Sequence, residues 1–207
     1  MVKPSELDPK PAGVRMRRAY FDCTYGQLHV RTAFPATGGF DEQTTLVCLH
    51  GREGSSRSFA RLLPEMANDR SVYAPDLPGY GESDPPFSES AADAARAVAD
   101  LARDLRLRHI DVLGVEFGAL VALTLAASES DLLRRLVLLR IPPLEGLPAV
   151  RQRSLILGTA QDARADDRFG KDVLPNARWL ELAGDAADPI NAAPGTLTKE
   201  ISAFLSE

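Results

Sequence analysis

The sequence predicts an α/β fold: a doubly wound, mostly parallel sheet covered by helices on both faces. Two observations predict this. Short apolar runs of strand-like composition alternate along the chain with segments of helical periodicity. Clusters of Gly, Pro, Asp and Ser follow several of these runs, as turns and loops do. The length of 207 residues suits one such domain. We therefore expect a polar N-terminal tail over 1–13 and a single domain over 14–207.

The first expected elements form a hairpin, two buried strands and a helix. Alternating side chains with β-branched or aromatic residues favour an antiparallel hairpin at a sheet edge, with extended segments at 14–21 and 26–34. Continuous apolar runs at 44–49 and 71–74 are typical of strands buried on both faces. Between them, apolar residues at three- and four-residue spacing predict a helix over 58–68.

The rest of the chain repeats the alternation of strand and helix. Residues 88–107 are rich in alanine and free of Gly and Pro, and Ser90 and Asp93 are spaced as a helix-capping pair. In order, the remaining elements are a strand at 109–113, an apolar helix at 117–127, strands at 136–139, 155–157 and 178–182, and an amphipathic helix at 197–205. Such alternation calls for parallel strands joined by helices.

Composition argues against several classes of function. A net charge of −5, with no basic cluster that carries interleaved aromatics, favours neither nucleic acid nor an anionic membrane as partner. No apolar run approaches the roughly 20 residues of a spanning helix, and the N-terminal residues lack a signal-peptide core. Two cysteines do not suggest a disulfide framework, so we expect a cytoplasmic protein. No nucleotide motif or Cys/His cluster predicts a cofactor or metal ion.

Four segments together resemble the α/β-hydrolase superfamily. They are YGQLHVRTA at 25–33, LHG at 49–51 with Gly54-Ser55-Ser56 behind it, DLPGYGES at 76–83, and VLGVEFG at 112–118. The resemblance runs through residues 20–140, and a weaker match continues to the C-terminus. It implies an α/β-hydrolase fold, in which a strand-to-helix turn of pattern G-x-S-x-G presents the nucleophilic serine.

At that turn the sequence has Gly114-Val115-Glu116-Phe117-Gly118, so both glycines are present and glutamate replaces serine. The histidine that the resemblance implies after the last strand aligns with Ala187, and no histidine follows His109. Asp162 lies one residue beyond the common position of the family acid, and it is either a relic of that acid or a carboxylate of the loop. A serine nucleophile needs a base to take its proton and return it to the leaving group. We therefore interpret the chain as a small-molecule-binding pseudo-hydrolase with a degenerate triad.

The alternative is an atypical hydrolase, or a base-catalysed isomerase or lyase, that uses Glu116 on a small substrate. As a nucleophile, glutamate is one methylene longer than the aspartate found in some family members, and misplacement by about 1 Å can cost ~100-fold in rate. As a base, Glu116 would have its pKa raised by burial and lowered by the N-terminus of the adjoining helix.

A purely structural role for Glu116 is also open. Its carboxylate could bond to the backbone N–H groups of the former oxyanion hole, or pair with Arg52 or Arg140. These positions share the carboxyl edge of a doubly wound sheet, where ligands bind. We expect His50, Gly51, Arg52, Phe117 and Arg140 to contact a bound small molecule.

The link between the strands at 136–139 and 155–157 predicts a protein without a cap domain. It has about fifteen residues and is rich in proline, which leaves room for a short helical turn only. A site without a cap is shallow and wet. The link also carries Ile141, Leu144 and Leu147, and we expect a homodimer that covers them. The alternative is that the link folds back over its own sheet edge.

Overall fold

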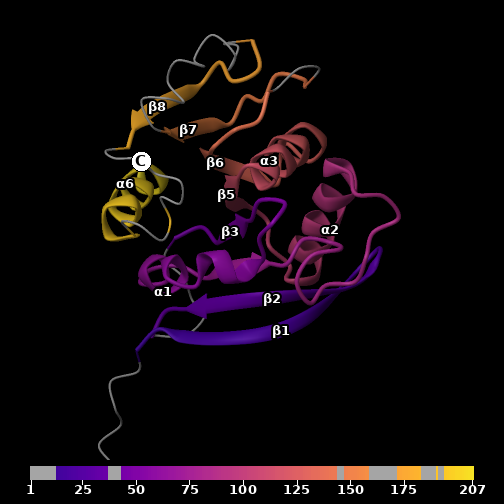
Figure 1. The fold of residues 1–207 in the computed structure, drawn as a ribbon. Helices are drawn as coiled ribbons and strands as arrows, with labels where there is room; N and C mark the ends of the chain where they lie inside the picture. The colour runs from indigo at the N-terminus through magenta and orange to yellow at the C-terminus, as the bar shows by residue number, and fades with distance from the viewer. Residues whose placement is uncertain (1–12, 37–42, 144–146, 159–171, 183–189, 191–193) are drawn as a thin grey trace, which may run out of the picture.

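The structure is a computed structural model that describes residues 13–36, 43–143, 147–158, 172–182, 190 and 194–207. In these residues eight strands form one sheet in the order β1-β2-β4-β3-β5-β6-β7-β8 (Figure 1). The strands are β1 (Arg15–Cys23), β2 (Gly26–Phe34), β3 (Leu46–Leu49), β4 (Val72–Pro75), β5 (Ile110–Val115), β6 (Leu133–Leu139), β7 (Arg153–Gly158) and β8 (Ala177–Glu181). Only β2 is antiparallel to its neighbours; the other described pairs are parallel.

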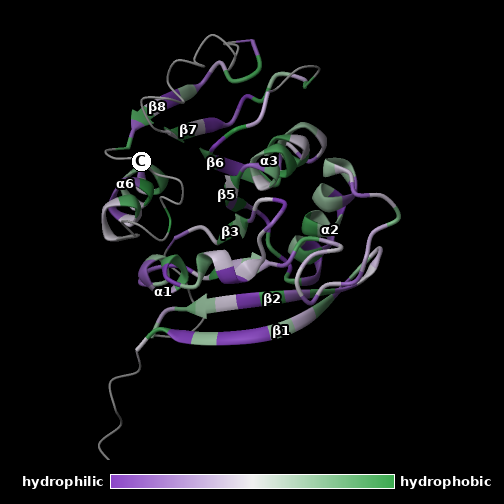
Figure 2. Ribbon diagram, viewed as in Figure 1, coloured by the Kyte–Doolittle hydropathy of each residue, from purple (hydrophilic) through white to green (hydrophobic). Residues whose placement is uncertain are grey.

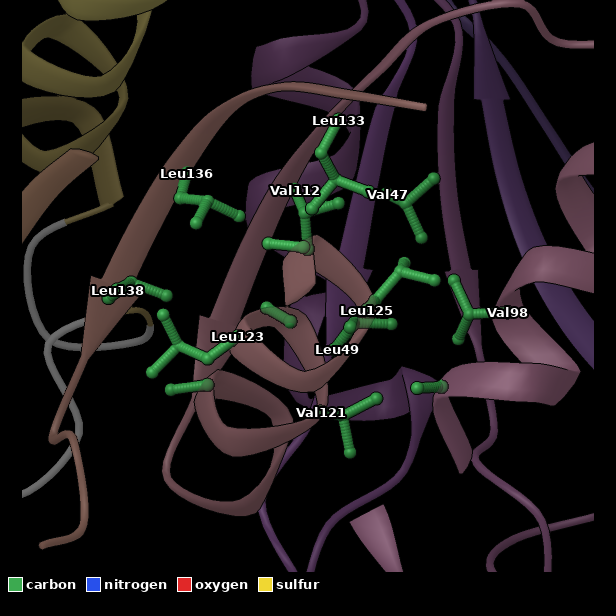
Figure 3. Packing of buried hydrophobic residues seen from close by; sticks show 14 of the residues in the cluster. Val47, Leu49, Val98, Val112, Val121, Leu123, Leu125, Leu133, Leu136 and Leu138 are labelled. Carbon is green, nitrogen blue, oxygen red and sulfur yellow. The ribbon is translucent and has the colours of Figure 1, made fainter. Parts of the chain in front are cut away.

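Helices cover both faces of this sheet, as the sequence predicts. They are the 3-10 turn η1 (Ser56–Phe59) and the helices α1 (Leu62–Met66), α2 (Ala91–Asp104), α3 (Phe117–Ser128) and α6 (Pro194–Ser206). In Figure 1, α2 and α3 lie on one face of the sheet and α1 and α6 on the other. One apolar core joins the sheet to α2 and α3, and a second joins it to α1 and α6. Figure 3 shows part of the first core, where Val121, Leu123 and Leu125 of α3 lie among apolar side chains of β3, β5 and β6.

The central strands place the candidate site residues at one edge. β5 lies between β3 and β6, with Gly114 opposite Leu49 and Val115 opposite Leu139. Parallel strands in this register end at the same level, so the residues that follow them are neighbours. The loop after β3, the turn after β5 and the first residue after β6 therefore meet at the carboxyl edge.

The fold class and the edge hairpin are confirmed, and one expected helix is corrected. Residues 58–68 do not form one helix, because η1 ends at Phe59 and α1 begins at Leu62. Proline is tolerated in the first turn of a helix but not in its interior, and Pro64 therefore fixes the start of α1 near Leu62. The capping prediction holds, since the backbone N–H of Asp93 donates to Ser90 Oγ at 3.1 Å.

The link between β6 and β7 has no helix in its described residues, which fits a fold without a cap domain. Ile141 and Leu147 are partly buried and pack against the core on the α2/α3 side, while Leu144 lies outside the described residues. These contacts favour the alternative in which the link covers its own apolar side chains. The homodimer stays a prediction. Separately, none of the described helices combines the length and the hydropathy that a membrane crossing requires.

Candidate functional site

The turn between β5 and α3 has the geometry of a nucleophile elbow. Glu116 adopts φ 51° and ψ −112°, a region that non-glycine residues rarely occupy. Its two flanking glycines are required by close packing. A Cβ on Gly118 would lie 2.1 Å from the carbonyl oxygen of Leu49, and one on Gly114 would lie 2.5 Å from that of Gly118. The elbow is therefore intact, and the positive φ of Glu116 is part of this tight turn.

The carboxylate of Glu116 is held by an ion pair. Arg140 Nη2 lies 2.7 Å from Glu116 Oε1, and the two side chains are 46% and 40% exposed. Arg140 follows β6 directly and also has a positive φ, 50°. Both partners thus sit on strained backbone, and such strain persists only where the surrounding structure enforces it. Of the roles considered for Glu116, pairing with Arg140 is the one observed, and its side chain makes no capping bond to the backbone of α3.

Arg52 and Phe117 lie beside this pair but interact with each other. The Arg52 guanidinium carbon is 4.3 Å from the centre of the Phe117 ring, a cation–π distance. Phe117 is itself buried and belongs to the core on the α2/α3 side. Its ring fixes the first turn of α3 and provides a platform for Arg52.

His50 shapes the loop after β3. The backbone N–H of Leu77 donates to Nε2 at 2.9 Å, so Nε2 is an acceptor and the ring proton sits on Nδ1, which donates to the carbonyl of Gly51 at 2.7 Å. Burial lowers the pKa of His50 and keeps the ring neutral. Both nitrogens are therefore committed to loop geometry. The loop passes close to the elbow, since a Cβ on Gly51 would lie 2.6 Å from Glu116 Oε2.

A second buried network holds the loop that follows β4. Asp76 accepts from His29 Nδ1 at 2.9 Å, from the Ser56 amide at 2.6 Å and from the Glu82 amide at 2.9 Å. Burial alone would raise the pKa of Asp76, but these hydrogen bonds outweigh it and the pKa lies below its usual value. The sequence did not predict the contact between His29 and Asp76, because this contact depends on the antiparallel placement of β2 beside β4.

A cavity of about 290 Å³ opens over the elbow. Its described lining consists of His50, Gly51, Glu53, Gly54, Ser58, Phe59, Val115, Glu116, Arg140 and Ile190. Four of the residues expected to form the site thus come together here: His50, Gly51, Glu116 and Arg140. Glu53 and Ser58 were not predicted, although both follow the HG turn closely in sequence.

Two expected positions lie outside the described residues: Asp162, and Ala187 where the family histidine would fall. In the part of the chain that is described, no group of three or more His, Cys, Asp and Glu side chains is placed to hold a metal ion. The arrangement therefore offers the Glu116–Arg140 ion pair, a second carboxylate on Glu53 and an apolar wall, while both ring nitrogens of His50 are already hydrogen-bonded within the loop.

Comparison with known proteins gives consistent matches. Residues 44–174 match the family model described as alpha/beta hydrolase fold. The segment matching 2-hydroxymuconate semialdehyde hydrolase of Pseudomonas sp. is 34% identical in an alignment of 118 residues that covers 51% of this chain and 41% of that protein. A soluble epoxide hydrolase of Corynebacterium sp. is 33% identical over 99 residues, 47% of this chain and 35% of that protein. The matched segments thus span less than half the length of these relatives.

Solved structures extend the match to nearly the whole fold. The epoxide hydrolase CorEH superposes with a TM-score of 0.80 at 16% identity, covering 93% of this chain and 99% of that one. A predicted CIB-like hydrolase from Thermoplasma acidophilum gives 0.81 at 16% identity, with 93% and 99% covered. At such identity the likeness is one of fold.

Proposed function

The chain belongs to the α/β-hydrolase fold family, and we propose that it binds a small molecule at the carboxyl edge without hydrolysing it. The observation that carries the proposal is the Glu116–Arg140 pair at the nucleophile position. A carboxylate oxygen in a charge-assisted hydrogen bond to a guanidinium has a lone pair engaged, and it attacks carbon poorly as a result.

The histidines of the chain give the second support. Hydrolysis through a covalent intermediate needs a base that activates water. His29 is buried against Asp76, both nitrogens of His50 are bonded, and His109 is exposed at the opposite end of β5 near the carbonyl of Asp131. None of the three is available to serve Glu116.

The cavity defines what kind of molecule would fit. Its volume of about 290 Å³ is at the small end for a ligand site. Phe59, Val115 and Ile190 give it an apolar wall, and the Glu116–Arg140 pair gives it an acceptor and a cation. The ligand we propose is therefore small, partly apolar and equipped with one polar group that meets the pair.

The alternative function is chemistry by Glu116 itself, as an atypical hydrolase or a base-catalysed isomerase or lyase. One observation favours it: the carboxylate lines the cavity and its side chain remains 40% exposed. Two of the proteins named above are epoxide hydrolases, which makes epoxides the first substrates to examine. In this alternative, turnover would disappear in Glu116→Gln, which removes the charge and keeps the shape.

A thermal-shift screen with short-chain acids, amides, amines and esters tests the binding proposal. We expect some members to raise the Tm of the wild-type protein. Ser58→Phe should abolish these shifts because it fills the cavity, whereas Ser130→Phe, at an exposed site at the other end of the sheet, should not. Shifts that are the same in all three proteins would place binding elsewhere and contradict the proposal.

A further inference from the structure

The edge hairpin concentrates positive charge on an acidic protein. The net charge of the chain is −5, yet Arg15, Arg17 and Arg18 follow one another closely on β1, and Arg31 lies on β2. Figure 2 shows β1 as a largely hydrophilic strand at the margin of the sheet. The three β1 arginines are exposed, and Arg31 is partly buried.

Two of these arginines face each other across the hairpin. Arg18 pairs directly with Arg31 in the β1–β2 register, so both side chains project to the same face. That face is the one that carries α1, since Ala33 shares it and packs in the core of α1 and α6, whereas Leu28 and Val30 pack toward α2. Like charges directly opposite on neighbouring strands destabilise a hairpin unless something compensates them.

The two guanidinium groups border a hollow. Its volume is about 230 Å³, and Met16, Arg17, Arg18 and Arg31 line it. Arg31 Nε is buried and has no hydrogen-bond partner among the described residues. A desolvated guanidinium N–H without an acceptor is costly, and it points to an anion that completes the site.

One acid on this face, Glu82, is already committed. Glu82 accepts from the Tyr20 hydroxyl at 3.0 Å and from Arg57 at 3.4 Å, so it compensates Arg57 instead of the arginine pair. Charges on an edge strand also prevent sheets from pairing edge to edge. That explanation covers β1 but not Arg31, because β2 is paired on both sides, with β1 and β4.

We infer that this hollow binds a phosphate-type dianion between Arg18 and Arg31. Guanidinium groups recognise tetrahedral oxyanions through paired N–H donors, and Arg31 Nε–H would supply one of them. Met16, 45% exposed at the rim, would contact an apolar substituent. The ligand is a small phosphate monoester, and the same headgroup on a lipid is the other source of this chemistry.

Titration of the protein with inorganic phosphate at constant ionic strength tests the site. Following Tm, with chloride as the reference anion, we expect a rise of about 3 °C at about ten times the Kd. The Nε–H resonance of Arg31 in an ¹⁵N NMR spectrum should shift over the same range. The Tm rise should disappear in Arg18→Gln and in Arg31→Gln, and the Arg31 resonance should no longer shift in Arg18→Gln. Both effects should persist in Arg108→Gln, which replaces an exposed arginine on the turn before β5.

The variants also separate binding from a structural role. Without phosphate, Arg18→Gln should be as stable as the wild type or slightly more stable, because the opposed charges are gone. Soluble glycerol phosphate and vesicles containing phosphatidic acid then distinguish the two sources. An absent phosphate shift, or one that survives in both Arg18→Gln and Arg31→Gln, would overturn the inference.

Discussion

Replacing Glu116 with glycine tests whether the elbow strain or the ion pair dominates at this position. A non-glycine residue at φ 51° and ψ −112° costs about 1–3 kcal/mol, which glycine relieves. Removing an ion pair whose side chains are 40% and 46% exposed costs about 0–1 kcal/mol. Glycine also adds unfolded-state freedom worth about 0.4–1 kcal/mol. Together these ranges place Glu116→Gly between about 1 kcal/mol less stable and about 2.5 kcal/mol more stable than the wild type, centred on a gain of about 1 kcal/mol.

Urea denaturation of three variants separates these contributions. Glu116→Gln keeps the strained backbone and removes the charge, so it should lose no more than about 1 kcal/mol. Glu116→Ala removes the ion pair and keeps a Cβ, so its difference from Glu116→Gly gives the backbone strain less the unfolded-state freedom that glycine adds. If Glu116→Gly loses more than about 2 kcal/mol, the pair with Arg140 holds the fold together and the reasoning is refuted.

Three further predictions concern packing, pH and assembly. Gly118→Ala should destabilise the fold by about 3 kcal/mol or more in urea, because its Cβ meets the backbone of Leu49; a milder loss would show that α3 can shift. Because burial lowers the pKa of His50, the unfolded chain takes up that proton first, so stability should fall as the pH drops below about 6.5, and this dependence should weaken in His50→Gln. An unchanged pH profile in that variant would contradict the neutral ring. Sedimentation equilibrium at micromolar concentration tests the homodimer, which Leu144→Asp should dissociate without unfolding; a monomeric wild type would contradict it.

The parts of the fold that depend on local pattern were predictable from the sequence. Hydrophobic period and turn residues indicate the strands and helices, and close packing forces Gly114 and Gly118 at any elbow of this kind. The prediction of one helix over 58–68 was wrong because it followed the apolar spacing and not the position of Pro64. Proline is not tolerated in a helix interior, so this segment divides into η1 and α1.

Features that depend on strand order were not predictable. Glu116 pairs with Arg140 because β5 and β6 are neighbours in the sheet, whereas Arg52 stacks on the ring of Phe117. The arginine pair on the hairpin was overlooked for a related reason. Its members lie thirteen residues apart in sequence and become neighbours only through the register of the turn, so no contiguous basic run reveals them.

The rate of p-nitrophenyl ester hydrolysis by the wild-type protein and by Glu116→Ala tests the central claim most directly. The elbow carries a carboxylate paired with Arg140, and no histidine of the chain is free to act as its base. We therefore predict the same background rate for both proteins across a range of short acyl chains. Ester turnover that is present in the wild type and lost in Glu116→Ala would contradict the account and make Glu116 a catalytic residue.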